Sequence, residues 1–181
     1  MSIAKQELAL AHREDRRGSR REDLEGRREL SADWSYRTKA GDPLPAADDD
    51  LETSWVVPRT LNGDEFFEIT FKAPVIVSGL VMRLARTSAF PNHFKIAGRL
   101  PNGQWIPVAW FDDAHKLQLL DTLLETPRNA SVGFDLGERE LTGLMGMVED
   151  DGSSFSGWSI SEIEVWVPAR PDGGRENRDA R

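Results

Sequence analysis

The chain has 181 residues, of which 39% are hydrophobic and 30% are charged, and its formal net charge is −8. This length accommodates one well-buried core and is too short for two ordinary domains, so we expect one domain with tails. Cysteine is absent, which excludes disulfide bridges, thiolate zinc sites and cysteine nucleophiles. No apolar run approaches the roughly 20 residues of a membrane span, so we do not expect membrane insertion.

Charge divides the chain into three parts. Residues 1–33 hold eight basic and eight acidic residues with few large apolar ones, which predicts a charged arm, partly helical or disordered. Residues 34–168 hold eleven basic and twenty acidic residues and form the predicted globular part. Residues 169–181 combine proline, paired glycine and alternating charge, which is typical of a flexible tail. Because the globular part is acidic, we do not expect a nucleic-acid partner.

Seven short segments between residues 65 and 167 have the pattern of β-strands. In residues 65–71, EFFEITF, the apolar Phe67, Ile69 and Phe71 alternate with polar residues, as in a strand with one buried face. Six similar segments are separated by Gly, Pro, Asn or Asp, and they span residues 80–84, 93–98, 104–111, 131–136, 141–148 and 160–167. So many short strands with little room for crossover helices predict an antiparallel β-sandwich.

Residues 114–125, AHKLQLLDTLLE, interrupt the strand pattern. Leu117, Leu120 and Leu124 have the spacing of one helical face, so we predict a short helix here.

Four stretches, in chain order, resemble motifs of the discoidin family. This family is also called the coagulation factor 5/8 C-type or galactose-binding-like domain, and it includes many bacterial carbohydrate-binding modules. The stretch AADDDLETSW is similar to the family's turn A-x-D-G-D-x-x-T-x-W, with matches at Ala46, Asp48, Asp50, Thr53 and Trp55. Later stretches resemble the family's following strands and its closing strand, and they span residues 66–82, 93–109 and 158–166. The resemblance implies an all-β fold, an eight-stranded antiparallel jelly-roll sandwich.

The resemblance also implies a structural calcium ion in the first loop. By position, its side-chain ligands would be Asp48, Asp50, Thr53 and Glu162, the last from the closing strand. Such oxygen groups suit Ca²⁺, which takes about six to eight of them. Asp49 replaces the family's glycine, and aspartate adopts a glycine-type backbone conformation less easily than glycine does. The alternative is a solvated acidic turn with Glu162 pointing outward, and the sequence leaves both open.

Two loops carry the residues that the resemblance implies for ligand binding. Family members that bind sugars combine an arginine, an asparagine or histidine and an aromatic ring, because sugars stack their C–H faces on rings and hydrogen-bond through their hydroxyls. Here that set would be Arg86, Phe90, Asn92, His93 and Phe155. The alternative is that Phe90 and Phe155 cap the core and that Arg86 pairs with an acidic neighbour.

Other aromatic residues are weaker candidates. Trp110, Phe111 and His115 form a second possible cluster in another loop. The remaining tryptophans of the resembling stretches are expected to pack rather than to bind a ligand, and they are Trp55, Trp105, Trp158 and Trp166.

We do not expect catalysis. Three acids on one loop lack the apolar pocket that raises the pKa of a glycosidase acid, and the three histidines are dispersed at positions 12, 93 and 115. No phosphate-binding loop, nucleophile elbow or dinucleotide fingerprint is present in the sequence.

Two functions from different classes therefore remain. The first is a non-catalytic carbohydrate-binding module with a structural calcium site, which docks a larger assembly onto glycans. The second is a structural or protein-interaction module of an assembly such as a virion tail or adhesion fibre, anchored by the charged arm. The N-terminal residues contain no continuous apolar segment, so we expect no signal peptide, and an extracellular particle or virion is a setting compatible with this.

Overall fold

The computed structural model describes residues 26–29, 33–61, 63–84, 90–91, 93–127, 130–149 and 156–169. These residues form strands β1 (Arg27–Glu29), β2 (Ser35–Thr38), β3 (Trp55–Thr60), β4 (Phe66–Arg83), β5 (Phe94–Arg99), β6 (Trp105–Trp110), β7 (Ser131–Val148), β8 (Ser156–Ile160) and β9 (Glu162–Val167). They also form the short 3₁₀-helix η2 (Leu44–Ala46) and the α-helix α2 (Asp113–Glu125).

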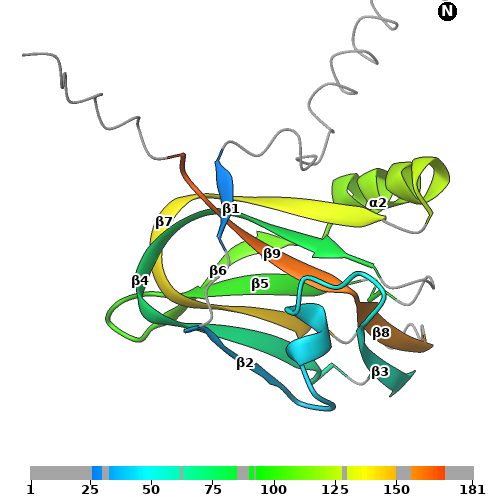
Figure 1. Cartoon of the computed structure of the whole chain (residues 1–181), viewed down its shortest axis with the longest axis horizontal. Coiled ribbons are helices and arrows are strands. Elements are labelled where there is room, and N and C mark those ends of the chain that lie inside the picture. Colours follow the sequence, from blue (N-terminus) through cyan, green and yellow to red (C-terminus); the bar gives the residue numbers. More distant parts are fainter. Residues whose placement is uncertain are drawn as a thin grey trace, which may run out of the picture.

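Strands β4 and β7 each belong to both layers of the sandwich. Each is 18 residues long, and they pair antiparallel from the Phe66–Met147 end to the Arg83–Ser131 end. Figure 1 shows both strands curving at one side of the molecule and returning in the other layer. The register shifts near this bend, between Thr70 and Val75, as expected of bulges that bend a strand.

The strand order follows from this curvature. One seven-stranded sheet runs β1-β9-β4-β7-β5-β6, with β2 also paired to β4, and β3 and β8 form a second, two-stranded sheet. All of the described pairs are antiparallel. The antiparallel β-sandwich predicted from the sequence is therefore confirmed.

The predicted strands differ from the observed ones in their limits. Segments 65–71 and 80–84 are the two ends of β4, and segments 131–136 and 141–148 are the two ends of β7. The last predicted segment is divided at Ser161 between β8 and β9. Strands β1, β2 and β3 were not among the seven predicted segments, so the described residues form nine strands rather than eight. Two of the three are only three and four residues long, too short for a clear periodicity.

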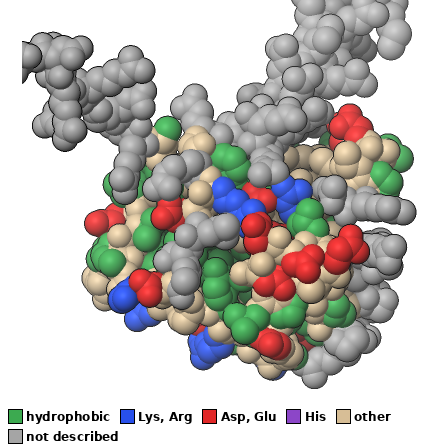
Figure 2. Space-filling view, in the orientation of Figure 1, with side chains coloured by type: hydrophobic (Ala, Val, Ile, Leu, Met, Phe, Trp, Pro, Cys, Tyr) green, Lys and Arg blue, Asp and Glu red, His purple; other side chains and the backbone are tan. Residues whose placement is uncertain are grey.

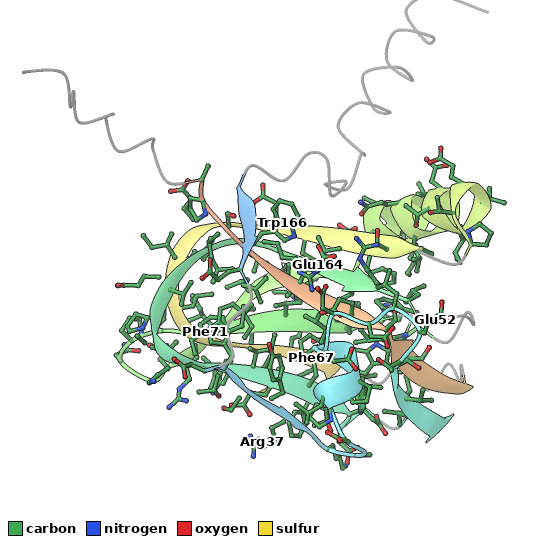
Figure 3. All side chains as sticks on the ribbon, viewed as in Figure 1. Arg37, Glu52, Phe67, Phe71, Glu164 and Trp166 are labelled. Atoms are coloured by element: carbon green, nitrogen blue, oxygen red, sulfur yellow. The ribbon has the colours of Figure 1, made fainter. Side chains whose placement is uncertain are left out.

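The core lies between the two layers, as Figure 3 shows for Phe67 and Phe71. Both predicted inward rows are at most 4% exposed, and they comprise Phe67, Ile69, Phe71, Leu80, Met82 and Leu84. Trp158 is fully buried, and its ring lies 5.0 Å from that of Trp55 and 5.7 Å from that of Phe67. These packed rings close the end of the core beneath β3 and β8.

Helix α2 is confirmed, but its buried side is not the predicted one. Leu117, Leu120 and Leu124 share a face as expected, yet each is more than half exposed. The helix packs against β7 through the neighbouring row of Leu119, which is buried, and Leu123, which is partly buried. No helix among the described residues is long and apolar enough to cross a membrane.

Candidate functional site

The segment of residues 47–54, named here the acidic bend, is fixed by a buried residue on either side. Ala46 and Trp55 are both buried, and Trp55 Nε1 donates a hydrogen bond of 2.7 Å to the carbonyl oxygen of Ala40. Between these two anchors the chain must return over the end of the sandwich, so its aspartates stay at the surface. Figure 2 shows acidic side chains gathered over this region, next to basic side chains near β1.

The aspartates of the acidic bend hold its own backbone in place. Asp48 Oδ1 accepts from the backbone N–H of Asp50 at 3.0 Å, and Asp50 Oδ1 accepts from that of Glu52 at 2.9 Å. The hydroxyl of Thr53 donates to Asp48 Oδ2 at 2.8 Å. These are the turns that Asp and Thr side chains form with nearby main-chain groups. They agree with the acidic turn of the alternative, but its outward-pointing Glu162 is wrong, because Glu162 is buried.

Glu162, the first residue of β9, lies directly against the acidic bend. Its side chain is 1% exposed, its Oε2 accepts from the backbone N–H of Asp49 at 3.0 Å, and its Oε1 accepts from Nη2 of Arg28 at 3.0 Å. Burial raises the pKa of Glu162 to about 7, against the opposing effects of Arg28 and of the hydrogen bond from Asp49. The acidic bend and the closing strand therefore meet, although they are far apart along the chain.

Arg28 of β1 was not among the residues predicted for this site. Its Nη1 donates to Asp49 Oδ1 at 2.7 Å while its Nη2 donates to Glu162, so one guanidinium group joins the acidic bend to β9. Nothing in the sequence distinguishes Arg28 from the other basic residues of residues 1–33. Its role becomes visible only when β1 is seen to pair with β9.

The four predicted calcium ligands have different partners in this structure. Asp48 and Thr53 contact each other, the carboxylate of Asp50 bonds its own turn, and both oxygens of Glu162 are engaged by Asp49 and Arg28. Among the described residues, no group of three or more His, Asp and Glu side chains is placed to hold a metal ion. The hydroxyl of Thr53 does lie within 3.2 Å of the carbonyl oxygens of Pro45 and Asp50 and of the Asp48 carboxylate, so oxygen atoms gather at that point. Calcium binding stays a prediction of the resemblance.

Asp49 adopts the backbone conformation that its position requires. Its φ of 63° makes it the one described non-glycine residue with a positive φ, and it stands where the resembling motif has glycine. We expect Asp49→Val to lower the free energy of unfolding by about 1 to 2 kcal/mol, because a left-handed backbone is unfavourable for a β-branched residue. Asp49→Gly should change it by less than about 0.5 kcal/mol, since the lost ion pair with Arg28 is exposed on the Asp49 side.

Urea denaturation of the two variants measures this difference. If both variants lose the same free energy of unfolding, the positive φ of residue 49 does not disfavour a β-branched side chain there.

The predicted ligand-binding residues are placed only in part. Arg86, Asn92 and Phe155 lie outside the described residues. Phe90 is buried, with its ring 5.2 Å from that of Phe94 and 5.0 Å from that of Phe111, so it packs in the core as the alternative reading has it. His93 is exposed.

An exposed tryptophan lies beside Lys95, at the end of β6. Trp110 is 52% exposed and is the cross-strand partner of Lys95 on β5, so the two side chains share the outer face of the sheet. Lys95 Nζ lies 2.8 Å from Glu149 Oε1, and the backbone N–H of Glu149 donates to the carbonyl oxygen of His93 at 2.9 Å. We name His93, Lys95, Trp110 and Glu149 the rim cluster.

The rim cluster retains one member of the second predicted group. Of Trp110, Phe111 and His115, the structure leaves Trp110 at the surface and buries Phe111. His115 turns inward, with its ring stacked 4.7 Å from that of Phe134 and its Nδ1 2.6 Å from Asp112 Oδ1. Phe111 and His115 therefore both pack inward, and His115 also caps the N-terminus of α2.

Solved structures of carbohydrate-binding modules have a fold similar to that of this chain. The family 32 module of C. perfringens NanJ, solved in complex with galactose, is 13% identical and has a TM-score of 0.55 over 75% of this chain and 94% of that one. A chitosan-binding module from a chitosanase/glucanase of Paenibacillus sp. IK-5 is 13% identical, with a TM-score of 0.56 over 74% of this chain and 95% of that one.

A third structure, the family 32 module of AlyQ in complex with 4,5-unsaturated mannuronic acid, is 12% identical, with a TM-score of 0.56 over 77% of this chain and 98% of that one. No protein-family model and no curated protein matches the sequence. At these identities the likeness concerns the fold. The chain therefore has the galactose-binding-like β-sandwich fold of these carbohydrate-binding modules, as its resemblance to the discoidin family predicts.

Proposed function

We propose that this chain is a non-catalytic carbohydrate-binding module that docks a larger assembly onto glycans. Its fold is shared with modules solved in complex with galactose and with 4,5-unsaturated mannuronic acid, and it spans nearly their full length. The observation that carries the proposal to this chain's own residues is the exposed ring of Trp110, next to charged side chains at one end of the sandwich.

The rim cluster has the chemistry that sugar recognition needs. The half-exposed ring of Trp110 offers an apolar face for sugar C–H groups, and Lys95 and Glu149 beside it offer a donor and an acceptor for hydroxyls. Lys95 belongs to β5, Trp110 ends β6, and Glu149 directly follows β7. The pairing of β5 with β6 and β7 therefore fixes the spacing of the backbone at these three residues. Such a rigid platform loses little side-chain entropy when a ligand binds.

A pair of tryptophan variants tests the rim cluster. We expect Trp110→Ala to weaken binding to the best ligand of a glycan array at least about tenfold, which corresponds to about 1.4 kcal/mol. Trp105→Ala is the matched control, because Trp105 begins the same strand and lies at its other end. Isothermal titration of the native chain and both variants measures the effect, and equal weakening by both would place the ligand elsewhere.

The residues of the predicted site outside the described ranges extend this proposal. Arg86 and Asn92 belong to the connection that ends at His93, and Phe155 belongs to the connection that begins after Glu149. We propose that Arg86 and Phe155 complete the ligand site, so that alanine at either position lowers glycan affinity in the same titration.

A protein-interaction module of a larger assembly is the second candidate. The row of Leu117, Leu120 and Leu124 on the outer side of α2 favours it, since exposed apolar rows often mark protein contacts. An array without any binding glycan, together with a co-purified partner that is lost when residues 1–25 are deleted and β1 is kept, would decide for this candidate.

A further inference from the structure

Glu162 is a buried acid that needs a positive charge beside it. Its side chain is 1% exposed, and Asp48 and Asp49 both lie near enough to oppose its ionisation. A buried carboxylate without a partner is strongly unfavourable, whereas one that is paired and fully hydrogen-bonded is tolerated. When Glu162 is ionised, the acidic bend therefore needs a cation beside it to close over β9.

One guanidinium group supplies this charge. Arg28 directs Nη1 to Asp49 at 2.7 Å and Nη2 to Glu162 at 3.0 Å, so the exposed and the buried carboxylate share one planar group. Two hydrogen bonds in a fixed fork suit arginine and not lysine. The second oxygen of Glu162 accepts from the backbone N–H of Asp49, so each oxygen of the buried acid accepts a hydrogen bond.

Arg28 is held at this place by backbone pairing. Strand β1 aligns Arg28 opposite Trp166 and Glu29 opposite Val165 of β9. Gly26, just before β1, has a φ of 140°, and a Cβ atom at this residue would lie 2.2 Å from the carbonyl oxygen of Val167. A glycine is therefore required where β1 meets the end of β9, so the attachment of this segment depends on its sequence.

We infer that Arg28 is the resident cation of the acidic bend, and that its guanidinium group, not a calcium ion, neutralises Glu162, the closing-strand member of the ligand set that the resemblance assigns to calcium. The contacts of Glu162 support this reading, because one of its oxygens accepts from Arg28 and the other from the backbone of Asp49. The chain thereby ties its own N-terminal strand to the loop and to β9. A domain that begins at residue 34, as predicted, would lack β1 and the ion pairs of Arg28.

A double-mutant cycle tests whether Arg28 acts through Glu162. At pH 8, where Glu162 is ionised in the native chain, we expect Arg28→Met to lower the melting temperature by roughly 3 to 6 °C, because the buried acid loses its partner and must take up a proton. In the Glu162→Gln background the same change should lower it by less than a third as much, because no buried charge is left unpaired. If Arg28→Met alone does not fold, the double variant is still expected to fold.

Arg37→Met is the matched control, since Arg37 of β2 pairs with Glu68 of β4, and Figure 3 shows Arg37 away from the core. It should shift the melting temperature equally in both backgrounds. The native chain is also expected to melt at the same temperature in EDTA and in millimolar calcium. The inference is overturned if calcium raises the melting temperature of the native chain in a concentration-dependent way, or if Arg28→Met is equally costly in both backgrounds.

Discussion

Trp158→Ala is expected to lower the free energy of unfolding by about 3 to 5 kcal/mol, the range observed when large aromatic side chains are removed from cores. Trp158 is fully buried, and its ring packs against Trp55, Phe67 and Phe94 with centroids 5.0, 5.7 and 6.0 Å away. Alanine would leave a cavity between rings that strand pairing prevents from closing. Urea denaturation followed by circular dichroism measures the loss.

Trp158→Phe is the control for this change. The indole Nε1 of Trp158 is buried and has no hydrogen-bond partner among the described residues, so phenylalanine keeps most of the packing and gives up no described hydrogen bond. We expect a loss of less than about 2 kcal/mol. Nearly equal stability of the Ala variant and the native chain would show that Trp158 is not part of the core.

The second large effect is a loss of stability as the pH rises through Glu162. Its pKa is raised from an ordinary 4.5 to about 7 in the folded chain, so folding favours its protonated form. The stabilisation is fully present below about pH 4.5 and is lost as the pH rises through about 7. Since one pKa unit is worth about 1.4 kcal/mol, the whole change is roughly 3 kcal/mol.

Glu162→Gln isolates this effect from other titrating groups. The charged or titratable groups around Glu162 are Arg28 from β1, Tyr36 from β2 and Asp48 and Asp49 from the acidic bend. Relative to the native chain, the Gln variant should have similar stability near pH 4.5 and should be more stable near pH 8, as measured by chemical denaturation in EDTA. A difference between the two chains that stays constant with pH would contradict a raised pKa.

The β-sandwich could be predicted because its long strands alternate strongly. Phe67 and Ile69, and Leu80 and Met82, stand two residues apart and point to the same side, so the sequence pattern identifies one buried face. The continuity of β4 could not be predicted in this way, because its exposed bend at residues 72–74 resembles a loop. Which face of α2 is buried depends on β7, and the sequence of the helix alone does not contain that information.

The part of the candidate site around the acidic bend could be predicted, because its positions match a motif. The contact between the acidic bend and Glu162 follows from matching positions in the resembling motifs, and so does the positive φ of Asp49. Arg28 could not be found in this way, because β1 has no apolar periodicity and its place depends on pairing with β9. The exposure of Trp110 depends likewise on the register between β5 and β6.

We propose that this β-sandwich binds a glycan at the end where Trp110 is exposed. The chain has six tryptophans, and ¹⁵N-labelling gives each indole N–H its own nuclear magnetic resonance signal. On titration with the best ligand of a glycan array, we predict that the indole signal of Trp110 shifts saturably while those of Trp55 and Trp105 stay in place. A bound glycan that leaves the Trp110 signal unmoved, or an array without any binding glycan, would contradict the account.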